Sequence, residues 1–212
     1  MAIDYRTEPL ARYLDDAASA RPTPGGGGVA AVAGALASTM AAMAAGFTAG
    51  KERFKDVEPE IREHLGRLAE IRESLLALAH DDMAAYEGIM AAYRLPKETD
   101  EEKSARREAV RTATRASLDV VGRVRDAAVE ILTVSRRLAD IANPNLVSDV
   151  GVAAELALGT VRAAGINAAV NLAGYTDADD AAAVRAETDA ALAEADRLAG
   201  ETRDLVLATI NK

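Results

Sequence analysis

The sequence predicts an all-α protein, a bundle of about six helices around a central helix rich in alanine and glycine, with no sheet. Half of the residues are apolar, yet only 3% are aromatic, and alanine, the best helix former, is abundant. No segment alternates apolar and polar residues with a period of two, and no Asn-Gly hairpin signal occurs. Because no linker divides the chain, we expect residues 1–212 to form one domain.

The first three helices are delimited by caps, glycines and prolines. Thr7 is the expected cap of a first helix that ends near Ala18. A second helix is expected over about Gly28 to Gly50. The third covers Glu58 to Arg94 and stops there because Pro96 disfavours helix in the residue before it.

Three further helices complete the expected bundle. Thr99 opens the capping box "TDEE", and the helix that it starts should run to about Ile141, with Ser117 as the place for a break. Ser148 is the expected cap of a fifth helix, about Asp149 to Leu172. The last helix follows "YTDADD" and reaches almost to the end of the chain.

Composition excludes several functions. A net charge of −9 argues against a general nucleic-acid binder, which needs a basic surface. The absence of cysteine rules out disulfides, thiolate metal sites and a cysteine nucleophile. His64 and His80 have no partners at metal-ligand spacing, so no metal is expected. No secretory signal opens the chain, and we therefore expect a cytoplasmic protein.

An uncharged interval separates Arg21 from Lys51, a stretch of 29 residues that opens with Gly25–Gly28. Its large apolar residues form one helical stripe: Val29, Val32, Leu36, Met40, Met43 and Phe47. A lipid-facing helix would carry large apolar residues on all sides. We therefore predict a buried central helix of a soluble protein rather than a membrane span.

Asp82 is the polar member of an apolar series in the third helix. Ile61, Leu68, Leu75 and Ile89 share its seven-residue spacing and therefore its helical face. A carboxylate on such a face must be paired, hydrogen-bonded or shifted in pKa. Two interpretations stay open: a structural carboxylate tied to an arginine or a backbone group, or a functional one.

Other polar groups also allow a structural and a functional interpretation. Asn167 and Asn171 are four residues apart and project in one direction. The segment "ANPNLVSDVG" gathers side-chain donors and acceptors around a helix start, where they either cap the helix or hold a polar ligand. The glycine run could bring backbone N–H groups to an anion, but no Gly-Lys-Ser/Thr follows as in a P-loop.

Four separated segments resemble the cyclodeaminase/cyclohydrolase family of folate enzymes: "PTPGGGGVAAVAGALASTMAAM", "GKERF", "DDMAAYEGIMAAYRLPKETDEEK" and "NPNLVSDVGVAA". The resemblance covers nearly the whole chain. It implies an all-helical homodimer, with no nucleic-acid or membrane partner, that acts on the one-carbon bridge between N5 and N10 of tetrahydrofolate and needs no other cofactor. Two positions depart from the family: Gly28 stands where serine is frequent, and Ser117 where many members have proline.

The implied activity is hydrolysis of 5,10-methenyl-tetrahydrofolate to 10-formyl-tetrahydrofolate. The alternative within the family is 5-formimino-tetrahydrofolate cyclodeamination, which releases ammonia; a chain without a formiminotransferase domain favours the hydrolase. The alternative from another class is a non-enzymatic helical protein that merely dimerises. It predicts no folate binding and no special state for Asp82 or Lys51.

The resemblance also assigns residues to the expected site. Asp82 and Asp149 share the roles of base and pterin recognition, in an order that stays open, and Lys51, if desolvated, is the proton shuttle. Combined with the polar positions above, the expected substrate-binding residues are Pro24, Gly25, Gly26, Gly27, Gly28, Tyr86, Asn143, Asn145, Ser148, Asn167 and Asn171.

Overall fold

The computed structural model describes residues 3–211 and confirms the all-α prediction, since those residues contain six α-helices and no strand. The helices are α1 (Leu10–Ala17), α2 (Gly26–Gly46), α3 (Glu58–Tyr93), α4 (Asp100–Ile141), α5 (Val147–Leu172) and α6 (Ala178–Ile210). Two single turns of 3₁₀-helix, η1 (Glu52–Phe54) and η2 (Pro144–Leu146), precede α3 and α5.

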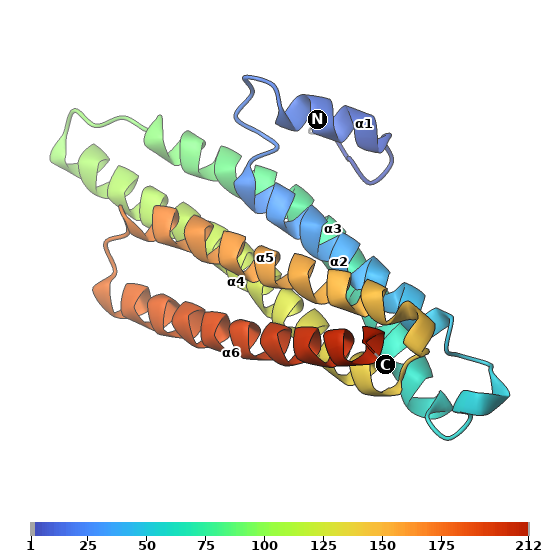
Figure 1. Ribbon diagram of the computed structural model, residues 1–212. Helices are drawn as coiled ribbons and strands as arrows, with labels where there is room; N and C mark the ends of the chain where they lie inside the picture. Colours follow the sequence, from blue (N-terminus) through green and yellow to red (C-terminus); the bar gives the residue numbers. More distant parts are fainter. Residues whose placement is uncertain (1–2, 212) are drawn as a thin grey trace.

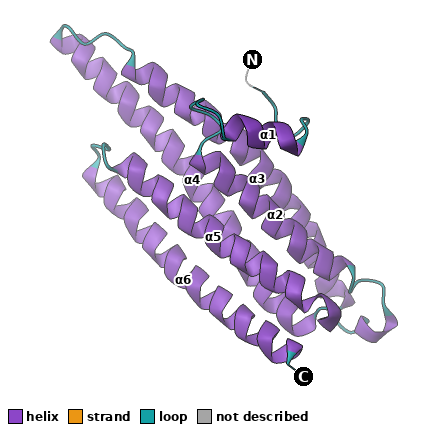
Figure 2. Ribbon diagram, turned by 45° about the horizontal axis from the view of Figure 1, so that its top comes forward, coloured by secondary structure: helices purple, strands orange, loops and turns teal. Residues whose placement is uncertain are grey.

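The five long helices run along one axis, and the short α1 lies outside them (Figures 1 and 2). Helix α2 packs against α3, α5 and α4, and α4 also packs against α3, α5 and α6. One cluster of buried apolar residues includes side chains from each of the five long helices, α2 through α6. The arrangement makes α2 a central member of the bundle.

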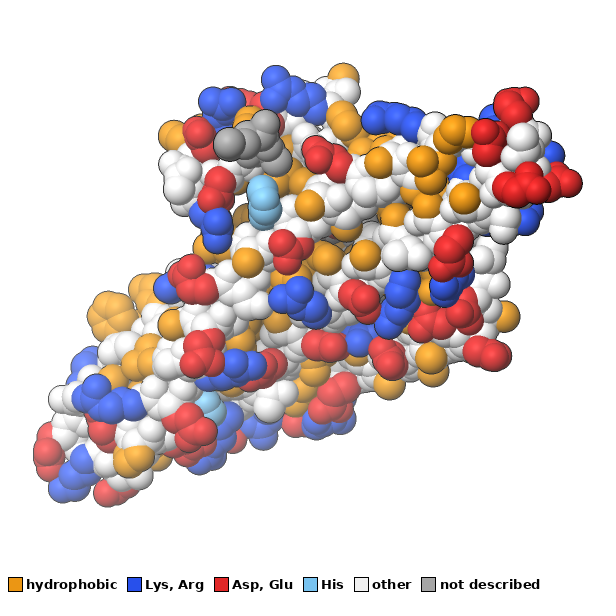
Figure 3. Space-filling view, turned by 180° about the vertical axis from the view of Figure 1, so that it is seen from behind, with side chains coloured by type: hydrophobic (Ala, Val, Ile, Leu, Met, Phe, Trp, Pro, Cys, Tyr) orange, Lys and Arg blue, Asp and Glu red, His pale blue; other side chains and the backbone are white. Residues whose placement is uncertain are grey.

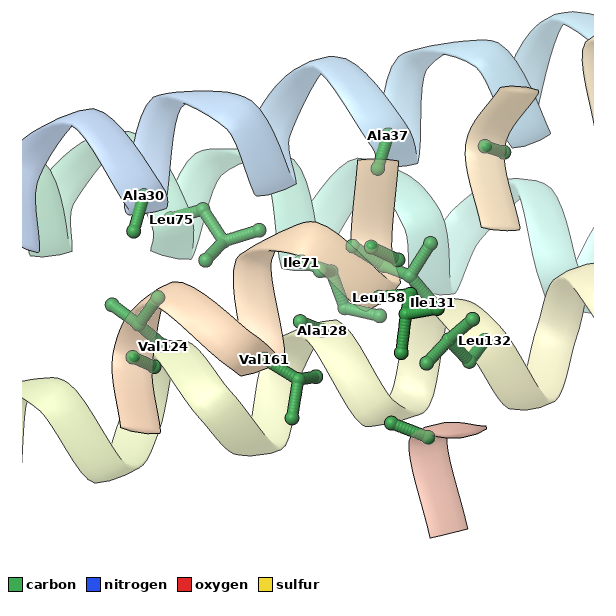
Figure 4. Packing of buried hydrophobic residues seen from close by; sticks show 14 of the residues in the cluster. Ala30, Ala37, Ile71, Leu75, Val124, Ala128, Ile131, Leu132, Leu158 and Val161 are labelled. Carbon is green, nitrogen blue, oxygen red and sulfur yellow. The ribbon is translucent and has the colours of Figure 1, made fainter. Parts of the chain in front are cut away.

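Small residues allow α2 to approach its neighbours closely. Its buried positions are glycine, alanine and Ser38, and Figure 4 shows Ala30 and Ala37 facing longer side chains of other helices. At Gly34 a Cβ atom would lie 3.1 Å from Leu75 Cδ1 and 3.2 Å from Thr160 Cγ2. The longer side chains of α3 and α5 therefore fill the space that α2 leaves.

The large apolar stripe of α2 faces outward in this chain. Val29, Leu36, Met43 and Phe47 are 45%, 51%, 42% and 51% exposed. The predicted burial of α2 thus holds for its alanine and glycine face but not for the stripe. Among the described residues α2 is also the one helix long and apolar enough to cross a membrane, although 56% of that window is buried in the bundle.

Two predicted boundaries near α1 and α2 were wrong. Thr7 does not cap α1, because its hydroxyl donates to Asp4 O over 3.0 Å while Pro9 occupies the cap position. Helix α2 ends at Gly46 rather than at Gly50, where the backbone has turned to a left-handed φ of +72°. Glycine is the residue that adopts this conformation without strain.

The later boundaries gave mixed results. The capping box at Thr99 is confirmed, with both reciprocal hydrogen bonds to Glu102 present. Helix α4 is not broken near Ser117. Ser148 is not the cap of α5, because the η2 turn lets the helix begin at Val147 with Leu146 before it. Ser148 therefore lies exposed inside the first turn.

Charged side chains of both signs are interspersed over the face shown in Figure 3. Several form ion pairs between helices, such as Arg137 with Glu60 at 2.7 Å and Arg203 with Glu155 at 2.9 Å. Exposed pairs of this kind contribute about 0–1 kcal/mol each. The alanine-rich core, rather than these pairs, therefore holds the helices together.

Candidate active site

Asp82 lies on α3 beside the first turn of α2. Its Oδ2 atom accepts a 2.8 Å hydrogen bond from the backbone N–H of Gly28. This amide is one of the N–H groups that a helix start leaves without an intrahelical partner. The carboxylate thus serves the glycine-rich start of α2 while its other oxygen, Oδ1, has no hydrogen-bonding partner within residues 3–211.

Two opposing effects act on the pKa of Asp82. Burial raises the pKa of this carboxyl above its ordinary value of 3.8, and the Gly28 hydrogen bond opposes that effect. No salt bridge to Asp82 is found among the described residues. The sequence-based expectation that this carboxylate must be hydrogen-bonded or shifted in pKa is therefore met in both respects.

Glycine is required at the start of α2 by close approach. A Cβ on Gly27 would lie 2.1 Å from Asp82 Oδ1, and one on Gly26 would lie 3.3 Å from Asn167 Oδ1. Gly25 occupies the cap position of α2, and Pro24 before it is buried. The glycine run therefore brings the α2 backbone against the side chains of α3 and α5.

A narrow gap, too small to hold a water molecule, lies at this meeting point. Its polar lining is Asp82 and Asn167, and its remaining lining comes from Gly27, Ala30, Val120, Val121, Val124 and Ala164. Asn167 donates its side-chain amide to Ala163 O over 2.9 Å, which leaves its Oδ1 directed at Gly26. Backbone, carboxylate and amide thus converge from α2, α3 and α5.

Tyr86 and Asn171 belong to the same end of the bundle but differ in setting. Tyr86 lies one turn after Asp82 on α3 and is 37% exposed, so its ring is accessible. Asn171 donates to Ser117 Oγ over 2.9 Å and so joins α5 to α4. This bond accounts for Asn171 structurally.

A second group of predicted residues surrounds the opposite end of α2. Asn143 is buried, and its Oδ1 accepts from Arg53 over 2.7 Å and from the Asn145 N–H over 3.2 Å. Its own N–H donates to Thr48 Oγ1 over 2.8 Å. Asn143 therefore fixes the turn before α5 to the segment after α2.

Three residues of this second group lie nearer the protein surface: Lys51, Ser148 and Asp149. Lys51 is exposed in the single chain, with its Nζ 5.7 Å from the centre of the Phe47 ring. Asp149 is partly buried in the first turn of α5 and makes no capping hydrogen bond. A carboxylate there interacts favourably with the helix dipole.

The two groups do not meet within one chain. Helix α2 has 21 residues and is therefore about 30 Å long at 1.5 Å per residue. Gly28 and Asp82 lie at its start, whereas Lys51 and Asn143 lie beyond its end. The expectation that Lys51 and Asp82 act in one site is therefore not met inside a single protomer.

Tyr13 is a residue of this site that sequence reasoning missed. It is the one buried residue of α1, and a Cβ on Gly28 would lie 3.7 Å from its hydroxyl oxygen. Negatively charged Asp82 contributes, after burial, to raising the pKa of Tyr13 to about 12. The signal available in the sequence was a single aromatic residue in a short amphipathic helix.

Metal coordination has no obvious place here. Within residues 3–211 no group of three His, Asp or Glu side chains is arranged to hold a metal ion. A partly buried carboxylate with a shifted pKa at a glycine-lined helix start marks this end of the bundle as a candidate small-molecule site. Comparison with known proteins identifies which class of enzyme this is.

The chain belongs to the formiminotransferase-cyclodeaminase family, whose model matches residues 9–190. It is 34% identical to the methenyltetrahydrofolate cyclohydrolase of Methylorubrum extorquens over 204 residues, which cover 96% of this chain and 98% of that protein. It is 28% identical to the formimidoyltransferase-cyclodeaminase of Sus scrofa over 188 residues, 89% of this chain but 35% of that longer protein.

A solved structure agrees with this assignment. The crystal structure of formiminotetrahydrofolate cyclodeaminase from Thermotoga maritima matches with a TM-score of 0.89 and 27% sequence identity. The match covers 97% of this chain and 98% of that one. The family resemblance inferred from the sequence motifs is therefore confirmed.

Proposed function

We propose that this protein hydrolyses 5,10-methenyl-tetrahydrofolate to 10-formyl-tetrahydrofolate. The observation that carries the proposal is the Asp82 carboxylate, partly buried beside the glycine-lined start of α2 with one oxygen unengaged among the described groups. Similarity along almost the full length of a methenyltetrahydrofolate cyclohydrolase supports this activity.

The reaction needs few groups from the protein. The methenyl bridge is an amidinium-like cation, so its carbon is already electrophilic. A water oxygen bonds to that carbon and gives one proton to a base. The tetrahedral adduct then opens as its hydroxyl loses a proton, the carbon–N5 bond breaks, and N5 takes up a proton. Tetrahydrofolate is the one-carbon carrier, and we propose no further cofactor.

Asp82 and Asp149 suit the two carboxylate tasks, taking the proton from water and reading the amino and ring N–H donors of the pterin. Lys51 suits the proton delivery that ring opening requires. The glycine run brings the α2 backbone against Asp82 and Asn167 and so fixes these two side chains at the start of the helix. These proposed catalytic and binding roles therefore fall on residues from both ends of α2.

We propose that a homodimer joins the two ends. The outward stripe of α2 supplies an apolar surface for a second copy, and a two-fold axis crossing α2 between Leu36 and Met43 would pair the stripes antiparallel. That axis lies midway between Gly28 and Lys51 along the chain. The two-fold axis would therefore place Lys51 of the partner subunit near Asp82. The same symmetry would place Lys51 of this chain near the partner's Asp82.

A mixing experiment tests the shared site. Lys51→Met and Asp82→Asn dimers are each expected to be inactive. If each site uses both chains, dissociating and reassociating an equal mixture restores about a quarter of wild-type activity, because half of the dimers then hold one intact site. If each site lies within one chain, the mixed dimers stay inactive, and the shared site is rejected.

Substrate turnover tests the activity itself. Purified protein is incubated with 5,10-methenyl-tetrahydrofolate, and the loss of its near-ultraviolet absorbance is followed against the Asp82→Asn variant. A wild-type rate equal to the uncatalysed rate would overturn the proposal.

Cyclodeamination is the second candidate, favoured by the likeness to a formiminotetrahydrofolate cyclodeaminase structure. In that reaction N10 attacks the 5-formimino carbon and ammonia leaves, so the tetrahedral centre forms at the same carbon. Ammonia release from 5-formimino-tetrahydrofolate, measured in parallel, separates the two activities. Family membership favours either enzyme over a non-enzymatic dimerisation protein. Cytoplasmic location stays a prediction.

A further inference from the structure

Tyr13 anchors α1 to the bundle with a side chain that is 6% exposed. The Tyr5 ring packs edge-on against it, with ring centres 5.1 Å apart and planes at 86°. Tyr5 is itself held by a 2.9 Å hydrogen bond from its hydroxyl to Asp16. The orientation of the Tyr13 ring is therefore fixed by aromatic packing on one side and by α2 and α3 on the other.

The Tyr13 hydroxyl is buried and has no hydrogen-bond partner among residues 3–211. A phenylalanine would supply the same apolar anchor without the cost of burying an unsatisfied polar group. Since its pKa is raised to about 12, the hydroxyl keeps its proton at neutral pH and remains a donor.

The Asp82 carboxylate and the Ala79 carbonyl oxygen lie near this hydroxyl, around the same point on Gly28. Measured from the Cβ position of Gly28, Asp82 Oδ2 lies at 3.6 Å and the Tyr13 oxygen at 3.7 Å, so both atoms flank one point. A cavity of about 150 Å³ between α1 and the α2–α3 pair borders Tyr13. It is large enough to hold a water molecule beside the Tyr13 hydroxyl.

The cavity beside Tyr13 is also bordered by Asp4, Arg6, Glu8 and His80. Asp4 pairs with Arg6 at 2.7 Å, and Glu8 lies 3.8 Å from Arg12. Around Asp82 itself, the other packed helices contribute uncharged groups. Helix α2 presents Gly27 and Ala30, α4 presents three valines, and α5 presents the uncharged Asn167. On α3 itself, Asp81 lies 3.7 Å from Arg123, and His80 lines the cavity with its Nδ1 unpartnered.

We propose that Tyr13 is a positioning residue for Asp82. Its hydroxyl donates a hydrogen bond to the Asp82 carboxylate in the working enzyme, directly or through one water, and so adds a second donor to the Gly28 amide. Helix α1 thereby takes part in the active site although it lies outside the bundle. This inference rests on the proposed role of Asp82 in turnover.

The test compares Tyr13→Phe with Tyr5→Phe, which removes a hydroxyl from the same aromatic pair on the side away from Asp82. Steady-state rates with 5,10-methenyl-tetrahydrofolate are measured across pH, together with thermal unfolding. Tyr13→Phe is expected to lower kcat about tenfold with KM changed less than twofold, the signature of a lost charge-assisted hydrogen bond. Tyr5→Phe should leave both constants unchanged.

The pH profile and a second background separate positioning from packing. Losing a donor raises the pKa of Asp82, so the acidic limb of the kcat profile should move to higher pH in Tyr13→Phe only. Adding Tyr13→Phe to Asp82→Asn should cause no further loss, because the hydroxyl acts through the carboxylate.

Wild-type kinetics in Tyr13→Phe, with unchanged or raised stability, would reduce Tyr13 to an apolar anchor and overturn the inference. An additive loss in the double variant would also overturn it. Full activity of Asp82→Asn alone is a different result, because it removes Asp82 from the mechanism and refutes the proposed role on which the inference rests.

Discussion

Gly27 and Asp82 approach so closely that a Cβ on Gly27 would lie 2.1 Å from Asp82 Oδ1. Real Cβ atoms do not occur at this distance, so the carboxylate occupies space that any other residue at this position would need. The glycine at the start of α2 and the carboxylate on α3 therefore define one structural unit.

Gly27→Ala should consequently displace Asp82, lowering stability by about 1–3 kcal/mol as in other overpacked sites and lowering turnover at least tenfold. Gly88→Ala is the matched control, because a Cβ on Gly88 meets nothing within 4 Å and α3 continues through it. That control should stabilise the protein by about 0.4–1 kcal/mol. The free energy of unfolding in urea and the turnover rate are measured for both variants. A Gly27→Ala protein with wild-type stability and activity would contradict the close contact.

Asp82 should also make stability depend on pH in a defined direction. Since burial raises its pKa above 3.8, the folded protein binds this proton more tightly than the unfolded chain does. The contribution of Asp82 to stability is then fully present below pH 3.8 and is lost as pH rises through the raised pKa. Urea unfolding across this pH range gives the free energy of unfolding of wild type and of Asp82→Asn. The wild-type value minus the variant value should fall as pH rises; an increase with pH would refute the raised pKa of Asp82.

Asp82→Asn and Lys51→Met should each lower turnover about 100-fold or more, typical of lost acid–base help. Both should fold, because asparagine keeps the shape of aspartate and methionine keeps an apolar stem. The double variant should lose little beyond the worse single one, since residues that act as a unit are not additive. Near-normal turnover in either single variant, with helical circular dichroism intact, would return that residue to a structural role.

Leu36→Glu should convert the proposed dimer to monomer and abolish turnover, because it places a charge in the middle of the apolar stripe. Leu207→Glu on α6 is the matched control, since Leu207 is 50% exposed and Leu36 is 51% exposed. Light scattering at equal concentrations gives the mass of each. If both variants keep the wild-type mass, the stripe is not the dimer surface.

Asp149→Ala should weaken substrate binding or turnover by more than the loss of a helix-dipole interaction explains. That interaction is worth about 0.3–1 kcal/mol of stability. A variant with such a loss but full activity would leave Asp149 with a structural role only. The comparison needs KM, kcat and the free energy of unfolding from the same preparation.

The sequence predicted the helices well because local signals mark their ends. Thr99 with Glu102 and the proline after Leu95 place two boundaries within a residue or so. Asp82 was found by its position on an apolar face, before any resemblance was used. These signals depend on neighbours within one or two turns, which a sequence displays directly.

The orientation of α2 and the separation of Lys51 from Asp82 were not predicted. Hydrophobicity favours turning the large residues inward, but the close packing of α2 against α3, α4 and α5 admits only small ones. The helix lengths do imply the separation of Lys51 from Asp82. Asp82 lies 24 residues into α3, so it sits beside the start of α2, whereas Lys51 follows the end of α2. In the proposed homodimer, the second copy would bring these ends together.

Because the large apolar side chains of α2 form one outward stripe, the number of residues in this helix is constrained more strictly than the identity of most of its side chains. One residue inserted within α2 would turn everything after it by about 100°, so Met43 and Phe47 would leave the surface that Val29 and Leu36 define. Alanine and glycine positions would meanwhile rotate toward solvent and larger ones into the bundle. Point substitutions should therefore be tolerated far more often in this helix than insertions or deletions.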